Sequence, residues 1–265
     1  MTSFTPVRSV LRALEVLSFV SRDRGSSIAD LHLQTGLPKP TLVRLLETLS
    51  SAGYVAKDVG RAEYRVTHLV EHLSAGFYGS PLIVQAARED ALDLTQRLKW
   101  PITVAVLDND AMVVLYSTVP ESPMSPGRPP AFSRYRLLTR AHGKTFLAFC
   151  SEEQRKLIVS SLRKSEHPED KLANSPASIA RIIAQTRELG YAFRDPRVEP
   201  KISSSLAVPL VVRGEAIGSL GMTYFASAVR PSEAVRRYVP ELKKAAKSIE
   251  SKVVELSQAR HEAER

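Results

Sequence analysis

The sequence predicts an α+β protein, with an N-terminal winged helix-turn-helix, a linker helix and a C-terminal α/β domain. Three observations predict this fold. Three helical patterns and one hairpin pattern fill the first 66 residues. Beyond residue 100, β-prone pairs of segments alternate with capped helices, and a long amphipathic pattern closes the chain. We place the domains at residues 6–67, 68–80 and 81–260.

Two helices are expected before residue 36. Residues 9–20 repeat apolar side chains with the spacing of one helical face. From residue 27, Ser27 and Asp30 form a capping-box pattern, and Gly36 supplies a helix stop. The expected inward-facing residues are Val10, Ala13, Leu14, Leu17, Ile28, Leu31 and Leu33.

The third helix starts among two prolines. Pro38 opens it and Pro40 still lies in its first turn, where a missing N–H breaks no hydrogen bond. Gly53 ends this helix, and two β-prone runs around a glycine-containing turn then predict a hairpin over residues 54–67. The expected inward stripe of the third helix is Leu42, Leu45, Leu46 and Leu49.

The third helix carries the most specific functional signal. In a helix-turn-helix, the N-terminal part of the second helix of the motif enters the major groove of DNA. Lys39 and Arg44 lie away from the leucine stripe and suit phosphates or guanine edges, while Thr41 suits a phosphate or a thymine methyl. An ordinary bundle helix is the alternative, which the preceding capped helix and the following hairpin disfavour.

Arg61 at the tip of the hairpin leaves two interpretations open, a minor-groove contact and a solvated turn. The residues that we assign to the DNA-binding surface are Ser27, Lys39, Pro40, Thr41, Arg44 and Arg61.

The C-terminal domain is expected to open with a helix over residues 82–99 and a hairpin that turns at Asn109 and Asp110. Trp100 is expected to pack at the junction between them. Five prolines between residues 119 and 130 require an irregular loop.

Helices and strands alternate in the rest of this domain. A helix is expected over residues 143–150, and two further helices are capped by Ser151 and Ser175, with a loop over 165–176 between them. Two strands, 202–212 and 216–225, precede a long amphipathic helix capped by Ser232. We therefore expect an antiparallel-rich sheet covered by helices.

Composition narrows the class of partner and of site. The 265 residues carry 37 Lys and Arg against 28 Asp and Glu, a net charge of +9 that favours nucleic acid or anionic surfaces. The single cysteine, Cys150, excludes an internal disulfide and a cysteine-cluster metal site, and we expect it to be buried. Charged residues interrupt the N-terminus, and no apolar run predicts a signal peptide or a membrane span. We expect a cytoplasmic protein without a metal, a cofactor or a membrane partner.

Two motifs allow a catalytic or metal-binding interpretation. HLVEH, residues 68–72, has the H-x-x-E-H metal spacing, but no third ligand follows it, so polar residues on a linker helix are favoured. SSS, residues 203–205, raises the alternative of a hydrolase that pairs Ser205 with His142. Neither a G-x-S-x-G elbow nor an orienting acid is evident, so we expect no enzyme. Hydroxyls that face a small pocket and a plain strand edge both remain open for this motif.

HGKT, residues 142–145, is similar to the end of a phosphate-binding loop. That loop requires a glycine at position 138, where this chain has Leu138. Gly143 is expected instead to let the backbone turn tightly into the helix. The N–H groups at the helix start are then able to bind a carboxylate.

Segments from both domains resemble one family. They are SVLRALEVL, SSIADLHLQTGLPKPTLVRLLETLSSAGYV and YRVT in the first domain, and HGKTFLAF, ELGYAF, SLAVPL and the final helix in the second. In this order they resemble the IclR family of bacterial transcription regulators over nearly the whole chain. Within the family, RLLETL, KWP, DAMVV, HGKTFLAFC and FASA are most similar to activators of 3-(3-hydroxyphenyl)propionate catabolism.

The resemblance implies a DNA-binding transcriptional regulator of a catabolic operon. It implies that the winged domain binds double-stranded operator DNA and that an α/β (GAF-like) domain binds a small organic acid, which we expect to be aromatic. It also implies a homo-oligomer, a dimer or a tetramer, and an activator would contact RNA polymerase as well. The effector-binding residues that it implies are Ala141 and His142 through their backbone amides, with Asp195, Ser205, Gly221 and Thr223.

Three positions depart from the family pattern. Pro40 stands where a small hydroxyl residue is frequent, and His142 stands where a small residue is frequent. The loop that contains Asp195 lacks the paired acidic residues that the family usually has.

Overall fold

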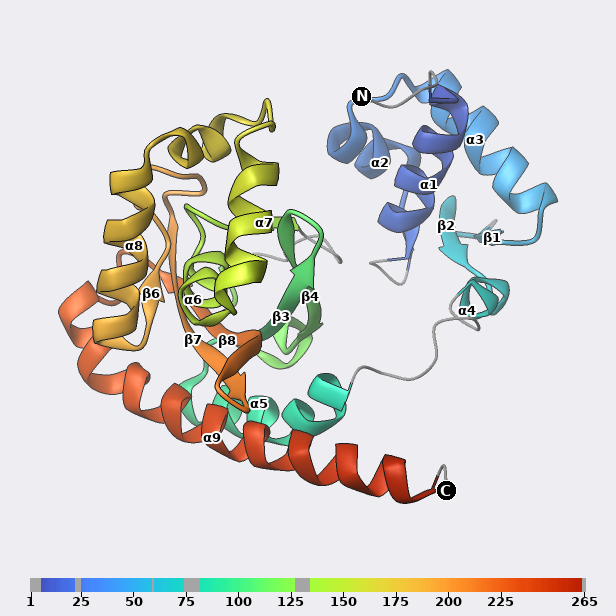
Figure 1. Cartoon of the computed structure of the whole chain (residues 1–265). Helices are drawn as coiled ribbons and strands as arrows, with labels where there is room; N and C mark the ends of the chain where they lie inside the picture. The colour runs from blue at the N-terminus through green and yellow to red at the C-terminus, as the bar shows by residue number, and fades with distance from the viewer. Residues whose placement is uncertain (1–5, 22–24, 59, 74–81, 127–133, 264–265) are drawn as a thin grey trace. The chain divides into compact units, whose positions relative to one another are not determined.

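The computed structural model describes residues 6–21, 25–58, 60–73, 82–126 and 134–263. The chain forms two compact units, Met1–Gly79 and Ser80–Arg265 (Figure 1). The expected linker helix over 68–80 is described only in part. Helix α4 covers Leu69–His72, while residues 74–80 lie outside the described residues, as do positions 127–130 of the proline-rich loop.

In the first unit, three helices and a two-stranded sheet precede α4, as the sequence predicts. Helices α1 (Arg8–Val20), α2 (Ile28–Thr35) and α3 (Lys39–Ser51) enclose one apolar core. Strands β1 (Val55–Asp58) and β2 (Glu63–Val66) form the antiparallel hairpin, with Val55 opposite Val66. The buried residues of this core are Val16, Leu17, Val20, Leu31, Leu37, Leu42, Leu46, Leu49, Val55 and Tyr64.

The expected inward faces of α1 and α2 are partly wrong. Val10 and Leu14 are exposed, because α1 buries its C-terminal half, at Val16, Leu17 and Val20. Leu33 is 83% exposed. Leu31 already points inward, and two helical residues that are two positions apart face nearly opposite directions.

The start of α3 explains why two prolines are tolerated. Pro38 is the N-cap and Pro40 is the second helical residue, so both precede the first intrahelical donor. That donor is the N–H of Leu42, which bonds to the carbonyl oxygen of Pro38 at 3.0 Å. Gly36 ends α2 with a φ of +67°, the left-handed conformation that glycine adopts without strain.

The second unit is built on one antiparallel sheet with strand order β5-β4-β3-β8-β7-β6. The hairpins β3–β4 and β7–β8 follow the sequence prediction. The pairing of β3 with β8, in which Thr103 lies opposite Gly221, joins them into one sheet. The edge strands β5 and β6 were not expected, because three and two residues are too few to show a period. The strands are β3 (Ile102–Asp108), β4 (Ala111–Ser117), β5 (Arg134–Arg136), β6 (Ala192–Phe193), β7 (Ser203–Val212) and β8 (Glu215–Phe225).

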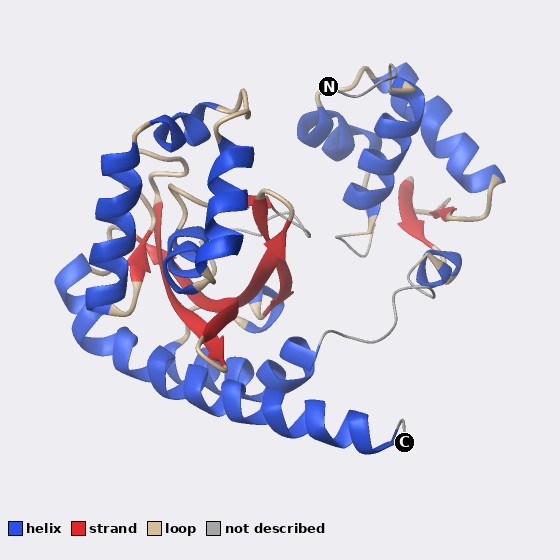
Figure 2. Cartoon of the chain, in the orientation of Figure 1, coloured by secondary structure: helices blue, strands red, loops and turns tan. Residues whose placement is uncertain are grey.

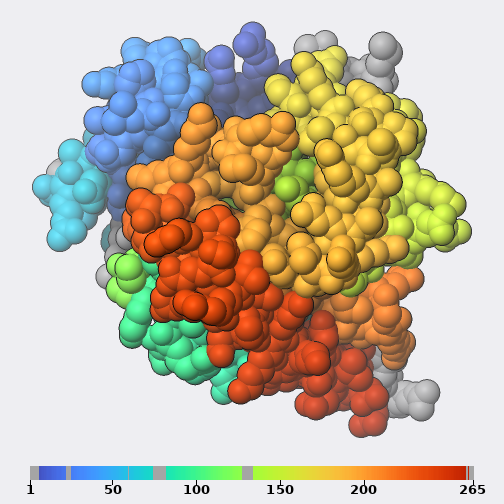
Figure 3. Space-filling model, turned by 90° about the vertical axis from the view of Figure 1, so that its left-hand side faces the viewer, coloured from blue at the N-terminus to red at the C-terminus, as the bar shows by residue number. Residues whose placement is uncertain are grey.

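Helices cover both faces of this curled sheet (Figure 2). Helices α5 (Leu82–Leu98) and α9 (Pro231–Ala263) pack on one face, over a core that includes Leu206 and Leu220. Helix α6 (Ala141–Phe149) packs on the other face against β7 and β8, with α7 (Glu152–Leu162) and α8 (Pro176–Leu189) outside it. Figure 3 shows α9 along the surface beside the end of α8, where Lys243 donates to the carbonyl oxygen of Leu189 at 2.8 Å.

Several local expectations are confirmed and others are corrected. Ser151 and Ser175 cap α7 and α8 as expected. Trp100 and Cys150 are buried. Ser232 is not the cap of α9, which already begins at Pro231. The expected loops contain two short 3₁₀ helices, η1 (Val119–Glu121) and η2 (Pro168–Asn174).

The reason for Gly143 also differs from the expectation. The glycine lies inside α6, which starts at Ala141, and not in a tight turn before the helix. A Cβ at this position would lie 2.6 Å from the carbonyl oxygen of Arg136. Gly143 therefore permits close approach of α6 to the chain after β5.

Candidate functional site

Helix α3 presents a polar surface at its N-terminal end. Lys39, Pro40 and Arg44 are exposed, and Thr41 is half-buried beside them. The opposite side of the helix is anchored in the core by Leu42, Leu46 and Leu49. The first N–H groups of α3 lack intrahelical acceptors, and the helix dipole adds partial positive charge there. This end of the helix is therefore suited to an anionic partner such as a DNA phosphate.

The turn between α2 and α3 is held by two side chains that the sequence analysis did not assign. The ring Nδ1 of His32 lies 2.7 Å from the carbonyl oxygen of Leu37. The hydroxyl of Thr35 donates to the carbonyl oxygen of Leu31 at 2.6 Å and accepts from the N–H of Leu37 at 3.1 Å. These bonds determine the angle at which α3 leaves α2. The sequence signal for this arrangement is Thr35 directly before the helix stop at Gly36.

Ser27 and Arg61 occupy different settings in the first unit. The Ser27 hydroxyl donates to Asp30 Oδ2 at 2.6 Å and accepts from the Asp30 N–H at 3.2 Å, so its proton is engaged in the cap of α2. Arg61 is exposed in the turn between β1 and β2. Its backbone N–H bonds to Asp58 Oδ1 at 3.3 Å, and its side chain extends from a turn that Asp58 organises. Lys57 and Arg65, which are also exposed on the hairpin, were not assigned from the sequence.

In the second unit, the His142 side chain is buried between two strands. Its Nε2 lies 2.8 Å from Thr103 Oγ1 on β3, and its Nδ1 lies 2.7 Å from Ser219 Oγ on β8. The ring stacks parallel to that of Tyr135 on β5, with centroids 5.9 Å apart. Burial lowers the pKa of His142 to about 4, so the imidazole is neutral at pH 7.

The imidazole also covers the strand face at Gly221. A Cβ on Gly221 would lie 2.5 Å from both Cε1 and Nε2 of His142, so the ring occupies the space that a side chain would need. Ala141, His142 and Gly143 are all buried. Of the positions expected at an effector, Gly221 thus lies beneath the His142 ring, and Ala141 and His142 at the start of α6 are buried.

Ser205 and Thr223 form the more accessible part of the same face. They are paired across β7 and β8, and their hydroxyl oxygens lie 3.0 Å apart. Both residues are half-buried, whereas Ser219 and Gly221 further along β8 are buried. Alternation along a strand places Ser219, Gly221 and Thr223 on one face. The structure therefore brings together the residues expected on β7 and β8, and their open end is at the hydroxyl pair.

Asp195 lies in the loop after β6 and bonds to its own neighbour. Its carboxylate accepts from the Arg197 guanidinium at 2.7 and 3.0 Å, and this hydrogen bonding lowers the pKa of Asp195 to about 2. Its backbone N–H bonds to the carbonyl oxygen of Thr139 at 2.8 Å. Burial lowers the pKa of nearby Lys144, whose ammonium donates to the carbonyl oxygen of Phe193 at 3.1 Å. The Asp195 carboxylate is thus already paired.

Arg194, which the sequence analysis did not single out, is a buried cation next to this face. The residue is 8% exposed. Its guanidinium donates to the carbonyl oxygens of Pro200, at 2.6 Å, and of Ser203. Burial, and then the positive charge of Arg140, lower its pKa. Among the described residues, no carboxylate forms an ion pair with Arg194, whereas Arg140 pairs with Glu169 at 2.9 Å.

The described residues do not form the catalytic pair or the metal site that two of the sequence motifs suggested. His142 bonds to Thr103 and Ser219, and Ser205 bonds to Thr223, so the Ser205–His142 pair of the hydrolase alternative is not formed. In HLVEH, His68 lies 3.8 Å from Glu71, and both side chains are exposed. The described part of the chain contains no group of three or more His, Cys, Asp or Glu side chains placed to hold a metal ion. It also contains no helix long and apolar enough to span a membrane.

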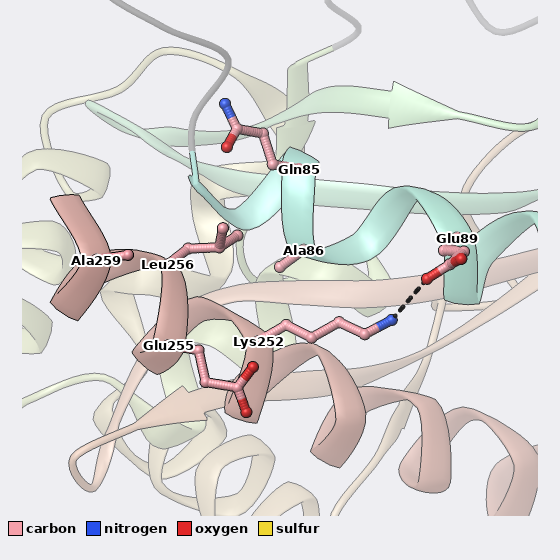
Figure 4. A pocket seen from close by; sticks show the side chains of 7 residues that line it. All are labelled: Gln85, Ala86, Glu89, Lys252, Glu255, Leu256 and Ala259. Atoms are coloured by element: carbon pink, nitrogen blue, oxygen red, sulfur yellow. Dashed lines mark hydrogen bonds and ion pairs between the residues drawn. The ribbon is translucent and has the colours of Figure 1, made fainter.

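A groove of about 370 Å³ lies between α5 and the C-terminal part of α9 (Figure 4). Lys252 crosses its floor and pairs with Glu89 at 3.2 Å and with Asp90 at 2.8 Å. Leu256 and Ala259 line its apolar end. The groove lies on the face of the sheet opposite to His142, so it is separate from the face that carries Ser205, Gly221 and Thr223.

Two family models together match most of the chain. Residues 9–59 match the IclR helix-turn-helix domain, and residues 80–251 match the bacterial transcriptional regulator IclR C-terminal domain. The chain is also 25% identical over 259 residues to the HTH-type transcriptional regulator KdgR of Escherichia coli (strain K12). This match covers 93% of each chain.

Solved structures have the same fold. The crystal structure of Thermotoga maritima IclR matches with a TM-score of 0.65 at 19% identity, over 94% of this chain and 99% of that chain. An IclR homolog from Microbacterium hydrocarbonoxydans, complexed with 4-hydroxybenzoate, matches with a TM-score of 0.61 at 20% identity. The second match covers 92% of this chain and 98% of that chain.

Proposed function

Because the chain belongs to the IclR family of bacterial transcriptional regulators, we propose that it controls a catabolic operon in response to an aromatic acid. Family membership makes it a DNA-binding regulator with a ligand-binding C-terminal domain. The aromatic effector and the operon are the proposal. A regulator that acts on DNA works in the cytoplasm, where we place this protein.

The exposed N-terminal end of α3 is the observation that carries the DNA-binding part of the proposal. The helix buries its leucines and leaves Lys39, Pro40 and Arg44 exposed. We propose that Arg44 and Thr41 contact base edges and that Lys39 contacts a phosphate. Arg61 is proposed to reach the adjacent minor groove from the hairpin turn. Phosphate contacts then supply much of the affinity and the bases the specificity.

Three features support a hydroxylated aromatic acid as the effector. A structural neighbour with the same fold is complexed with 4-hydroxybenzoate. The chain also carries short segments similar to activators of 3-(3-hydroxyphenyl)propionate catabolism. The half-buried hydroxyls of Ser205 and Thr223 suit a polar substituent of such an acid. Ala141, His142, Asp195 and Gly221 stay predicted members of the site.

We propose that the protein acts as a homo-oligomer, a dimer or a tetramer. A symmetric dimer requires a palindromic operator, with half-sites separated by whole turns of the DNA helix. The effector acts by binding more tightly to one of two states of this assembly, which shifts their populations. Contact with RNA polymerase belongs to the activator form of the proposal.

Footprinting on the DNA upstream of the encoding gene tests the proposal. We expect the wild-type protein to protect a palindrome there. We expect Arg44→Ala to abolish specific protection without altering fold or oligomeric state. Lys164→Ala, which removes an exposed charge from the second unit, is the matched control and should protect the same palindrome. An unchanged footprint for Arg44→Ala contradicts the assignment of α3.

The effector is tested on the same DNA fragment. We expect 4-hydroxybenzoate or 3-(3-hydroxyphenyl)propionate to change the DNA affinity of the wild-type protein and to raise its Tm. If neither acid has any effect while the footprint persists, the effector class is wrong and the DNA-binding assignment stands.

A further inference from the structure

The side chain of His142 fills one part of the strand face at the expected effector site. Its ring lies against Gly221 and bonds to both Thr103 and Ser219, so the part of the strand face nearest the start of α6 is filled. Further along the strands, Ser205 and Thr223 remain half-buried. The Ser205–Thr223 end, away from the N-terminus of α6, is therefore the part of this face that is left partly exposed to a ligand.

Arg194 is next to that open end. Its backbone N–H bonds to the carbonyl oxygen of Ser205 at 2.9 Å. Its guanidinium contacts Ser203 through the carbonyl oxygen and through the hydroxyl, the latter at 3.4 Å. Ser203 and Ser205 lie on the same face of β7, about 7 Å apart along the strand. A para-hydroxylated aromatic acid spans this distance between its carboxylate and its hydroxyl.

Among the described residues, no carboxylate lies within ion-pair distance of Arg194, and the charge of Glu199 acts on it only from further away. Arg140 is neutralised by Glu169 and Arg197 by Asp195. In the described part of the chain, the guanidinium of Arg194 donates to neutral acceptors, the two carbonyl oxygens and the Ser203 hydroxyl. A guanidinium does not lose its proton in a protein, so the charge persists. A buried cation without a carboxylate in direct contact is incompletely compensated, and a bound carboxylate would complete the pair.

We propose that Arg194 binds the carboxylate of the effector, whose polar substituent lies at Ser205 and Thr223. This inference rests on the proposed control by an aromatic acid and assigns the anchoring residue of that site. It replaces the backbone amides of Ala141 and His142 as the carboxylate-binding groups. Selectivity for an anion then depends on one side chain, which distinguishes an acid from its uncharged amide.

The test compares acids with their primary amides on the full-length protein. The probes are 4-hydroxybenzoate and 3-(3-hydroxyphenyl)propionate, each with its amide, and binding is measured by calorimetry and thermal shift. We expect the wild-type protein to prefer one acid over its amide by about tenfold or more. Arg194→Gln should remove this preference, because it lowers the affinity for the acid and leaves the affinity for the amide nearly unchanged. If Arg194 had only a structural role, the substitution would lower the affinities for the acid and for the amide equally.

Two variants complete the test. Arg197→Gln removes an exposed charge that is already paired with Asp195, and it should keep the acid preference. Ser205→Asp introduces a carboxylate beside Arg194. It should abolish acid binding even if Arg194→Gln does not fold.

The outcomes separate two failures. If Arg194→Gln keeps the preference, or Ser205→Asp binds the acid as the wild type does, the anchor is overturned and the effector class stands. If the wild-type protein binds neither acid but retains its footprint, the proposed effector class fails as well.

Discussion

The imidazole of His142 lies directly against the backbone of Gly221. A methyl group on Gly221 would come within 2.5 Å of two ring atoms and within 3.2 Å of the carbonyl oxygen of Leu206. Hydrogen bonds to Thr103 and Ser219 hold the ring in place, so a displacement of the ring would break them. A side chain at position 221 would therefore disturb the contact of α6 with β8 and the pairing of β8 with β7.

Gly221→Ala is expected to destabilise the second unit. Overpacking a filled site costs about 1–3 kcal/mol, because the ring must leave its hydrogen bonds or the strands must separate. Urea denaturation measures the loss. The double variant Gly221→Ala with His142→Ala should recover part of it, because the added methyl group then has space. Strictly additive losses would show that the two residues do not interact in this way.

The buried His142 predicts a pH-dependent stability. Its pKa is about 4 in the folded protein and 6.5 when unperturbed, so the unfolded chain binds a proton first. The stability contribution is complete above pH 6.5 and is lost as pH falls from 6.5 to 4. Between pH 6.5 and 5 we expect a loss of about 2 kcal/mol. Urea denaturation at both values, compared with His142→Gln, isolates this loss. An equal pH dependence in the variant would argue against it.

Two arginines of β5 are expected to differ in importance. Arg136 bonds to Asp170 at 3.1 Å, and the Asp170 side chain is fully buried. Arg136→Met leaves the buried carboxylate of Asp170 without its cation, so we expect the free energy of unfolding to fall by about 3–5 kcal/mol. Arg134→Met is the matched control, because Arg134 pairs with Asp108 and Asp110 in an exposed setting and should cost at most about 1 kcal/mol. Similar losses in thermal denaturation would contradict the special role of Asp170.

Ser27 is expected to contribute stability to α2 more than contacts to DNA. Its hydroxyl is engaged by Asp30, so Ser27→Ala should cost about 1 kcal/mol of unfolding free energy. At a temperature where both proteins are folded, its operator affinity should match the wild type. Ser27→Asp keeps a capping side chain and adds a negative charge. If this variant alone lost most of its DNA affinity, the result would support the assignment of Ser27 to the DNA-binding surface.

Pro40→Ser tests the most rigid position in the first turn of α3, the helix that we propose to contact DNA. Pro40 is exposed at the second position of α3, where the N–H of a serine would have no intrahelical acceptor. The serine hydroxyl and N–H add donors toward DNA, so operator affinity should rise several-fold. Stability should fall by at most about 1 kcal/mol, because the unfolded chain gains freedom. Fluorescence anisotropy with the footprinted DNA measures the affinity, and a decrease would indicate that the proline itself makes the contact.

Local patterns predicted most of the first unit correctly. The capping box of Ser27 and Asp30, the stop at Gly36 and the prolines at the start of α3 each act within a few residues, so the sequence records them directly. The inward face of α1 was less predictable. Its apolar side chains are distributed widely enough to offer two stripes, and only contacts with α2 and α3 select the one at Val16, Leu17 and Val20.

The candidate effector site was predicted by resemblance more than by pattern. The shared strand face of Ser219, Gly221 and Thr223 follows from the period of a β-strand. The burial of His142 beside Gly221 does not, because these residues are far apart in the chain and meet only when α6 packs on β8. Arg194 has no sequence pattern around it, and its proposed role follows from its burial and from the absence of an ion pair among the described residues.

The sequence by itself determined the order of the main elements, the caps of α2, α7 and α8, and α3 with its exposed Lys39 and Arg44, because these depend on contacts between near neighbours. The tertiary structure decided which apolar stripes are buried and added the edge strands β5 and β6. It also decided that His142 fills the face at Gly221 while Arg194 lies beside Ser205. The physical reason is range: hydrogen bonds and packing between distant segments exist only after the sheet has brought them together.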